Sequence, residues 1–122
     1  MEQNPEYLEA SKSFLGPDFD KIDQLFPVGL QDFNPEQGKY SLIWIQWVLG
    51  HLLDADLISF LQRCKKAVES QNGFIGIKEN VTRQGLDVDE VDSSVTRSDA
   101  LLKEIFTKAG LQIIKEETQQ GF

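Results

Sequence analysis

Two apolar runs of strand length, separated by a helical pattern, constrain the fold of this chain most strongly. The runs are residues 40–45 and 73–78. Between them, residues 54–68 place apolar side chains on one helical face: Leu57, Ile58, Leu61 and Val68. Continuous apolar strands are typical of a parallel sheet that is buried on both faces. The order of strand, helix and strand therefore predicts two parallel strands joined by a crossover helix.

Further elements are expected on either side of this unit. Asp54 is the candidate cap of the central helix, and residues 81–91 are acidic and predicted to be irregular. A helix is predicted over residues 5–15 and a short strand over 22–28. A further helix begins at Ser98 or Asp99 as its cap and ends at Gly110, and a third core strand follows over 111–115. A chain of 122 residues with this alternation is predicted to form one α/β domain with a mostly parallel sheet flanked by helices.

Charge and cysteine content narrow the classes of function. The net charge of −8, from 20 acidic and 12 basic residues, argues against a nucleic-acid surface and is compatible with a cationic partner. No apolar run approaches the roughly 20 residues that span a bilayer, and the acidic first residues lack a signal-peptide core. We therefore expect no membrane contact and a cytoplasmic or nuclear location. Cys64, the single cysteine, is expected to be an inert buried thiol.

Polar side chains follow the carboxyl ends of both predicted strands. Gln46, Trp47 and His51 come after the first strand, and Lys78, Glu79 and Asn80 end or follow the second. Parallel α/β sheets bind ligands beyond these strand ends, so the two groups are expected to meet at one rim. Two interpretations stay open for each aromatic residue. His51 is either a general base or a hydrogen-bonded histidine in the first turn of a helix, and Trp47 is either a stacking platform or a core aromatic.

The segment "LDVDEVDSS" gathers four carboxylates: Asp87, Asp89, Glu90 and Asp92. Its spacing lacks the glycine and glutamate of an EF-hand loop, so no metal is expected. It is either a solvated acidic loop or a cluster that receives a cationic substrate. No GxGxxG, GKS or GKT phosphate loop occurs in the chain.

Five segments together resemble the alpha N-terminal protein methyltransferases, which methylate the α-amine of proteins that begin with X-Pro-Lys. They are "GLQDF" (29–33), "IWIQWVLGHL" (43–52), "FLQRCK" (60–65), "IKEN" (77–80) and "DEVDSSVTR" (89–97). The resemblance implies an incomplete Rossmann-like fold of the class I S-adenosylmethionine-dependent methyltransferases. Residues 1–122 would be the C-terminal portion of the methyltransferase domain. The first two strands, the glycine-rich cofactor loop between them and the last strand would lie outside the chain, which leaves an apolar sheet edge.

The resemblance also implies a role for individual residues. Cofactor contacts fall on Glu2, which would bind the ribose hydroxyls, on Leu30 and Gln31 at the adenine end, and on Gln46. On the substrate side, Trp47 would pack against the first residues of the peptide and Asn80 would hold the first carbonyl. The substrate lysine would be received by Asp89 and Ser94. His51 and Asp92 would help to deprotonate the amine.

The reaction implied by the resemblance requires removal of a proton. An α-amine has a pKa of roughly 8, so much of it is protonated at neutral pH and has no lone pair to attack the methyl group. We expect the isolated 122-residue chain to be inactive because it lacks the glycine-rich loop. The alternative is a non-catalytic peptide-binding remnant or an inactive truncated isoform.

Overall fold

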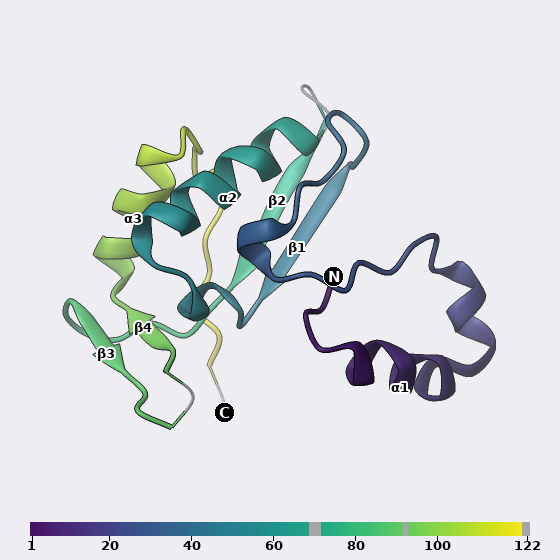
Figure 1. The fold of residues 1–122 in the computed structure, drawn as a ribbon. Coiled ribbons are helices and arrows are strands. Elements are labelled where there is room, and N and C mark those ends of the chain that lie inside the picture. The colour runs from purple at the N-terminus through teal and green to yellow at the C-terminus, as the bar shows by residue number, and fades with distance from the viewer. Residues whose placement is uncertain (69–71, 92, 121–122) are drawn as a thin grey trace.

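The centre of the molecule is a parallel pair of strands connected by a helix. The computed structural model describes residues 1–68, 72–91 and 93–120 (Figure 1). Strand β1 (Leu42–Gln46) pairs in parallel with β2 (Phe74–Lys78), and helix α2 (Asp54–Ala67) joins them. In Figure 1, α2 lies across the two strands, with α3 (Asp99–Lys108) at its side. The predicted strand–helix–strand unit is therefore confirmed.

Only one face of the parallel strands is covered in the described structure. Alternate residues of the strands, such as Ile45 and Ile77, pack with Phe60 and Cys64 of α2 and with Ile105 of α3. The side chains on the other face stay open to solvent: Leu42, Trp44 and Phe74 are 57%, 59% and 55% exposed. The expectation that both faces are buried is wrong, because no described helix covers the second face.

The ends of the helices follow local capping rules, with one correction. Ser98 caps α3 by accepting a hydrogen bond from the Leu101 amide at 3.2 Å, and Gly110 follows this helix with a φ of +81°. The cap position of α2 is occupied by Leu53, so the prediction of Asp54 as its cap is wrong. The Asp54 carboxylate binds Arg97 instead, at 2.9 Å. Helix α1 (Pro5–Leu15) is capped by Asn4 and lies to the side of the sheet (Figure 1).

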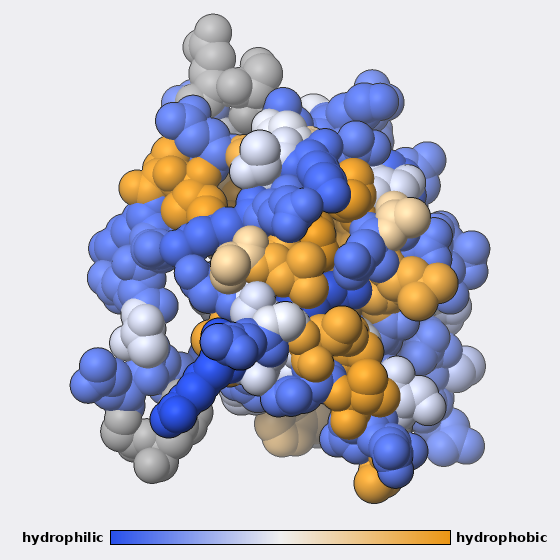
Figure 2. Space-filling model, turned by 90° about the vertical axis from the view of Figure 1, so that its left-hand side faces the viewer, coloured by the Kyte–Doolittle hydropathy of each residue, from blue (hydrophilic) through white to orange (hydrophobic). Residues whose placement is uncertain are grey.

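Two predicted strands are absent from the described structure, and one hairpin was not predicted. Residues 22–28 and 111–115 are irregular, because an apolar run becomes a strand only where a neighbouring chain offers a hydrogen-bonding edge. The acidic segment is not wholly irregular: β3 (Leu86–Val88) pairs antiparallel with β4 (Val95–Arg97). On the side that carries this hairpin and α3, hydrophobic areas alternate with hydrophilic ones (Figure 2). None of the helices in the described ranges is long and apolar enough to cross a bilayer.

Candidate functional site

The carboxyl ends of β1 and β2 meet at one rim, as the sequence predicts. Gln46 and Lys78 are register partners, and the amide of Trp47 donates to the carbonyl of Lys78 at 3.0 Å. Trp47 has a φ of +55°, in the left-handed region that side chains disfavour. Its ring is half exposed, and the Lys78 ammonium lies 5.1 Å from the ring centroid. Trp47 is thus a surface aromatic at the end of the strand and not a core residue.

The neighbouring rim residues are accessible. The side-chain oxygen of Gln46 accepts a hydrogen bond from the Trp44 indole at 3.0 Å. His51 is exposed and ends a short 3₁₀ turn, η3 (Leu49–His51). Asn80 is also exposed and borders a small pocket that Gly50 and Val95 help to line. The end of β2, the His51 turn and β4 therefore surround one hollow.

The hairpin places two of the predicted lysine-binding residues opposite each other. The amide of Asp89 donates to the Ser94 carbonyl at 2.8 Å, and the Asp89 carboxylate accepts from the Val91 amide at 2.9 Å. Asp92, the second predicted proton acceptor, lies outside the described residues. Within the described part of the chain, the carboxylates, His51 and Cys64 form no group of three that would hold a metal ion.

Glu2, one of the predicted cofactor residues, is joined by a backbone contact to the segment that precedes Leu30 and Gln31. The Glu2 amide donates to the Phe26 carbonyl at 3.1 Å, which brings the first residues beside the segment that leads to Gln31. A Cβ atom placed on Gly29 would lie 2.9 Å from the Gln31 side-chain oxygen and 3.2 Å from that of Gln3. The two glutamine side chains therefore converge on Gly29, with the Glu2 carboxylate one residue away. Leu30 is half-buried and packs against the core.

Three charged residues to which the sequence analysis gave no individual role hold these segments in place. Arg63 of α2 donates to the carbonyls of Leu30 and Phe33 at 3.0 and 3.1 Å. Glu79 accepts from the amides at the start of the His51 turn, and Arg97 donates to the carbonyls of Leu49 and Leu52. Arg97 is a charged residue in a buried part of the chain, but its partners lie more than 40 residues away in sequence. A larger hollow on α2, lined by Gln62, Lys65, Lys66 and Ala109, contains none of the predicted site residues.

Comparisons with known proteins agree on one family. A family model described as "AdoMet dependent proline di-methyltransferase" matches residues 1–122. N-terminal Xaa-Pro-Lys N-methyltransferase 1-B of Xenopus laevis is 45% identical over 117 residues, which cover 96% of this chain and 52% of the relative. The Homo sapiens N-terminal Xaa-Pro-Lys N-methyltransferase 1 is 44% identical over 116 residues, covering 95% and 52%. The chain thus spans about half the length of the curated relatives it matches.

A solved structure extends this agreement to the fold. It is described as a SAM-dependent methyltransferase of Leishmania major and superimposes with a TM-score of 0.85 at 33% sequence identity. The match covers 94% of this chain and 45% of that one. The described sheet and helices therefore correspond to part of a methyltransferase fold.

Proposed function

Because the chain belongs to the family of AdoMet-dependent proline di-methyltransferases, we propose that it provides the substrate-binding part of a protein N-terminal methyltransferase domain. The reaction is transfer of a methyl group from S-adenosylmethionine to the α-amine of proteins that begin Xaa-Pro-Lys, the substrate for which the relatives are named. The observation that carries the proposal is the rim formed by the ends of β1 and β2. There Gln46 and Trp47 each pair with Lys78, and Asn80 borders a pocket together with Gly50 of the turn that carries His51.

The peptide partner fits the chemistry of this rim. Trp47 offers a half-exposed ring against which the first residues of a peptide can pack. The exposed amide of Asn80 can bond a peptide carbonyl. The substrate lysine is assigned to Asp89 and Ser94, where the backbones of the hairpin are joined, because a carboxylate and an ammonium form a charge-assisted pair.

The proton of the substrate amine is assigned to His51 and Asp92. Only the neutral amine can attack the methyl group, so a proton acceptor beside it raises the reactive fraction. His51 is exposed at the rim, where a neutral imidazole nitrogen is accessible to a bound amine. Asp92 is the carboxylate that we assign to the same step from the resemblance of "DEVDSS".

The residues assigned to the cofactor fit its adenosine end. S-adenosylmethionine supplies an electrophilic methyl group on a sulfonium centre. A carboxylate such as Glu2 accepts hydrogen bonds from two ribose hydroxyls, and the amide of Gln31 can pair with adenine. The side chains of Gln31 and Gln3 approach the Cα of Gly29 closely, so only glycine fits where these two amides converge. Leu30 contributes an apolar contact, and the side-chain amide of Gln46 lies at the end of β1.

The test is a methyl-transfer assay with S-adenosylmethionine and an Xaa-Pro-Lys peptide, read by mass spectrometry. The proposal expects that any methyl group transferred lies on the α-amine and that an N-acetylated peptide gains none. Methylation of the lysine side chain, or of the acetylated peptide, would contradict the proposed substrate.

A second candidate function is peptide binding without turnover. It rests on the exposed side chains of Trp47 and Asn80, which can contact a peptide without a cofactor. This candidate expects the peptide to bind with and without S-adenosylmethionine and no product to form.

We also propose a cytoplasmic or nuclear location, with which the single buried thiol of Cys64 is compatible. Imaging of a tagged protein tests that location.

A further inference from the structure

The turn that carries His51 is held at both of its ends by groups of opposite charge. We propose that Glu79 and Arg97 are positioning residues that fix this turn, and with it the His51 imidazole, at the rim of the sheet. The inference rests on the proposed function in one respect, namely that the position of His51 matters for proton removal from the substrate amine.

The negative group lies at the start of the turn. One carboxylate oxygen of Glu79 accepts hydrogen bonds from the amides of Val48 and Leu49, at 2.9 and 3.0 Å. These amides point away from the turn and have no partner within it, as at the start of any helix. A carboxylate is the favoured acceptor there, because it also opposes the positive end of the local dipole. Glu79 directly follows β2, so the contact ties the turn to the strand.

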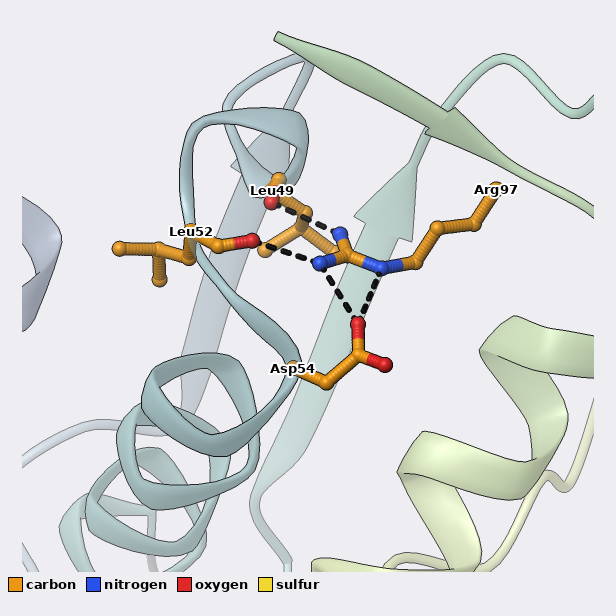
Figure 3. A network of polar contacts seen from close by, with 4 residues as sticks. All are labelled: Leu49, Leu52, Asp54 and Arg97. Carbon is orange, nitrogen blue, oxygen red and sulfur yellow. Dashed lines mark hydrogen bonds and ion pairs between the residues drawn. The ribbon is translucent and has the colours of Figure 1, made fainter. Parts of the chain in front are cut away.

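The positive group spans the turn, from the carbonyl of its first residue to that of the residue after it. The guanidinium of Arg97 donates to the carbonyl of Leu49 at 3.1 Å and to that of Leu52 at 2.6 Å (Figure 3). Its Nε and Nη2 atoms each lie 2.9 Å from one carboxylate oxygen of Asp54 at the start of α2. Arg97 is 4% exposed, and its bonds to the two carbonyls form away from water, where they are stronger, whereas the Asp54 carboxylate remains open to solvent. His51 lies in the chain between the two carbonyls that Arg97 holds.

A third contact presses the turn against the hairpin. A Cβ atom on Gly50 would overlap the backbone carbonyl oxygen of Val95, so only glycine permits this approach. Val95 is in the same strand, β4, as Arg97. Strand β4 therefore contacts the His51 turn through the backbone of Val95 and through the side chain of Arg97. The residue before this strand is Ser94, which is predicted to bind the substrate lysine.

A turn of this length needs such support. A 3₁₀ turn of three residues has too few internal hydrogen bonds to be stable alone. Arginine suits the role because its planar fork can serve two carbonyls and a carboxylate at once, which an ammonium cannot do with the same geometry. Moving the His51 turn would therefore require breaking its charge-assisted bonds to Glu79, which follows β2, and to Arg97 of β4, which is also paired with Asp54 of α2.

His51 is the only histidine of the chain, so its imidazole gives unambiguous NMR signals. The experiment records these signals for the full 122-residue chain, uniformly labelled at histidine, and for the variants Arg97→Lys and Glu79→Gln. Arg83→Met is the matched control, because Arg83 is exposed. We expect one narrow set of signals for the wild-type chain and for Arg83→Met. In Arg97→Lys and Glu79→Gln we expect these signals to shift and to broaden or double.

A merely structural role gives a different result. It would lower the denaturant midpoint of unfolding but leave the native His51 signals unchanged, and that outcome in both variants would overturn the inference. If Arg97→Lys does not fold, Glu79→Gln decides alone. The measurement uses neither peptide nor cofactor. Failure of the proposed function therefore appears separately, as the lack of any His51 shift when an Xaa-Pro-Lys peptide is added.

Discussion

At the scale of single residues, backbone strain and an exposed aromatic ring coincide at Trp47. A φ of +55° costs a residue with a side chain roughly 1–2 kcal/mol relative to the ordinary right-handed region. The amide of Trp47 keeps its bond to Lys78 in this conformation, and the ring stands half exposed at the rim. Strain held at an exposed aromatic residue suggests that binding, and not stability, determines the residue at this position.

Two substitutions at Trp47 distinguish the contribution of its ring to binding from the cost of its backbone conformation. Trp47→Ala and Trp47→Gly both remove the ring, so both should lose Xaa-Pro-Lys peptide binding. Glycine accepts a positive φ without strain, and Trp47→Gly should therefore be about 1 kcal/mol more stable than Trp47→Ala. Urea unfolding measures the difference, and an alanine variant that is as stable as the glycine variant would refute the assignment of strain.

The thiol of Cys64 makes the free energy of unfolding depend on pH in the alkaline range. Burial raises its pKa from 9.0 to about 12, and the nearby Arg63 charge lowers it by less. The unfolded chain releases this proton at lower pH than the folded chain, so the contribution to stability is complete below pH 9 and falls as the pH rises from 9 towards 12. The check is to measure the free energy of unfolding of the wild-type chain and of Cys64→Ala at about pH 7 and at about pH 10.5. The variant should lose less stability on going to the higher pH; an equal loss would contradict the prediction.

At the scale of elements, the sequence predicts what local signals determine. The two apolar strands, the amphipathic α2 and the serine cap of α3 each depend on residues within a few positions, and all are confirmed. The strand expected over 111–115 depends on a neighbour that its own residues do not identify. The β3–β4 hairpin was missed because its acidic composition resembles that of a solvated loop. Similarly, the rim was predictable from the strand ends, whereas Arg63, Glu79 and Arg97 act across 30 or more residues of sequence.

The contact between α2 and the "GLQDF" segment can be tested by removing the side chain of Arg63, which is expected to hold residues 29–33 in place. Arg63→Met removes the donors to the Leu30 and Phe33 carbonyls, and it should destabilise the chain by about 1–3 kcal/mol. Amides of residues 29–33 should exchange faster with solvent, because the segment loses its attachment to the helix. Lys66→Met is the control, since Lys66 is exposed on the same helix. Equal exchange in the two variants would show that Arg63 does not hold the segment.

At the scale of the whole molecule, one half of the candidate site is better defined than the other. The side that we assign to the peptide lies at the ends of two paired strands, where a pocket separates Asn80 from the His51 turn and the hairpin. The cofactor side rests on the contact of Glu2 with Phe26 and on the glutamines around Gly29. The other face of the sheet exposes Trp44 and its neighbours, and the chain matches about half of its relatives' length. Binding of the peptide can therefore be measured with this chain alone.

The most direct measurement is a calorimetric titration of the chain with an Xaa-Pro-Lys peptide and with the same peptide acetylated at its N-terminus. The rim is expected to bind the free peptide, and to bind the acetylated one at least about tenfold more weakly, because acetylation removes the charge of the amine. Trp47→Ala should bind neither peptide. Equal affinity for the two peptides, or undiminished binding by Trp47→Ala, would contradict the assignment of the rim as the site for the substrate N-terminus.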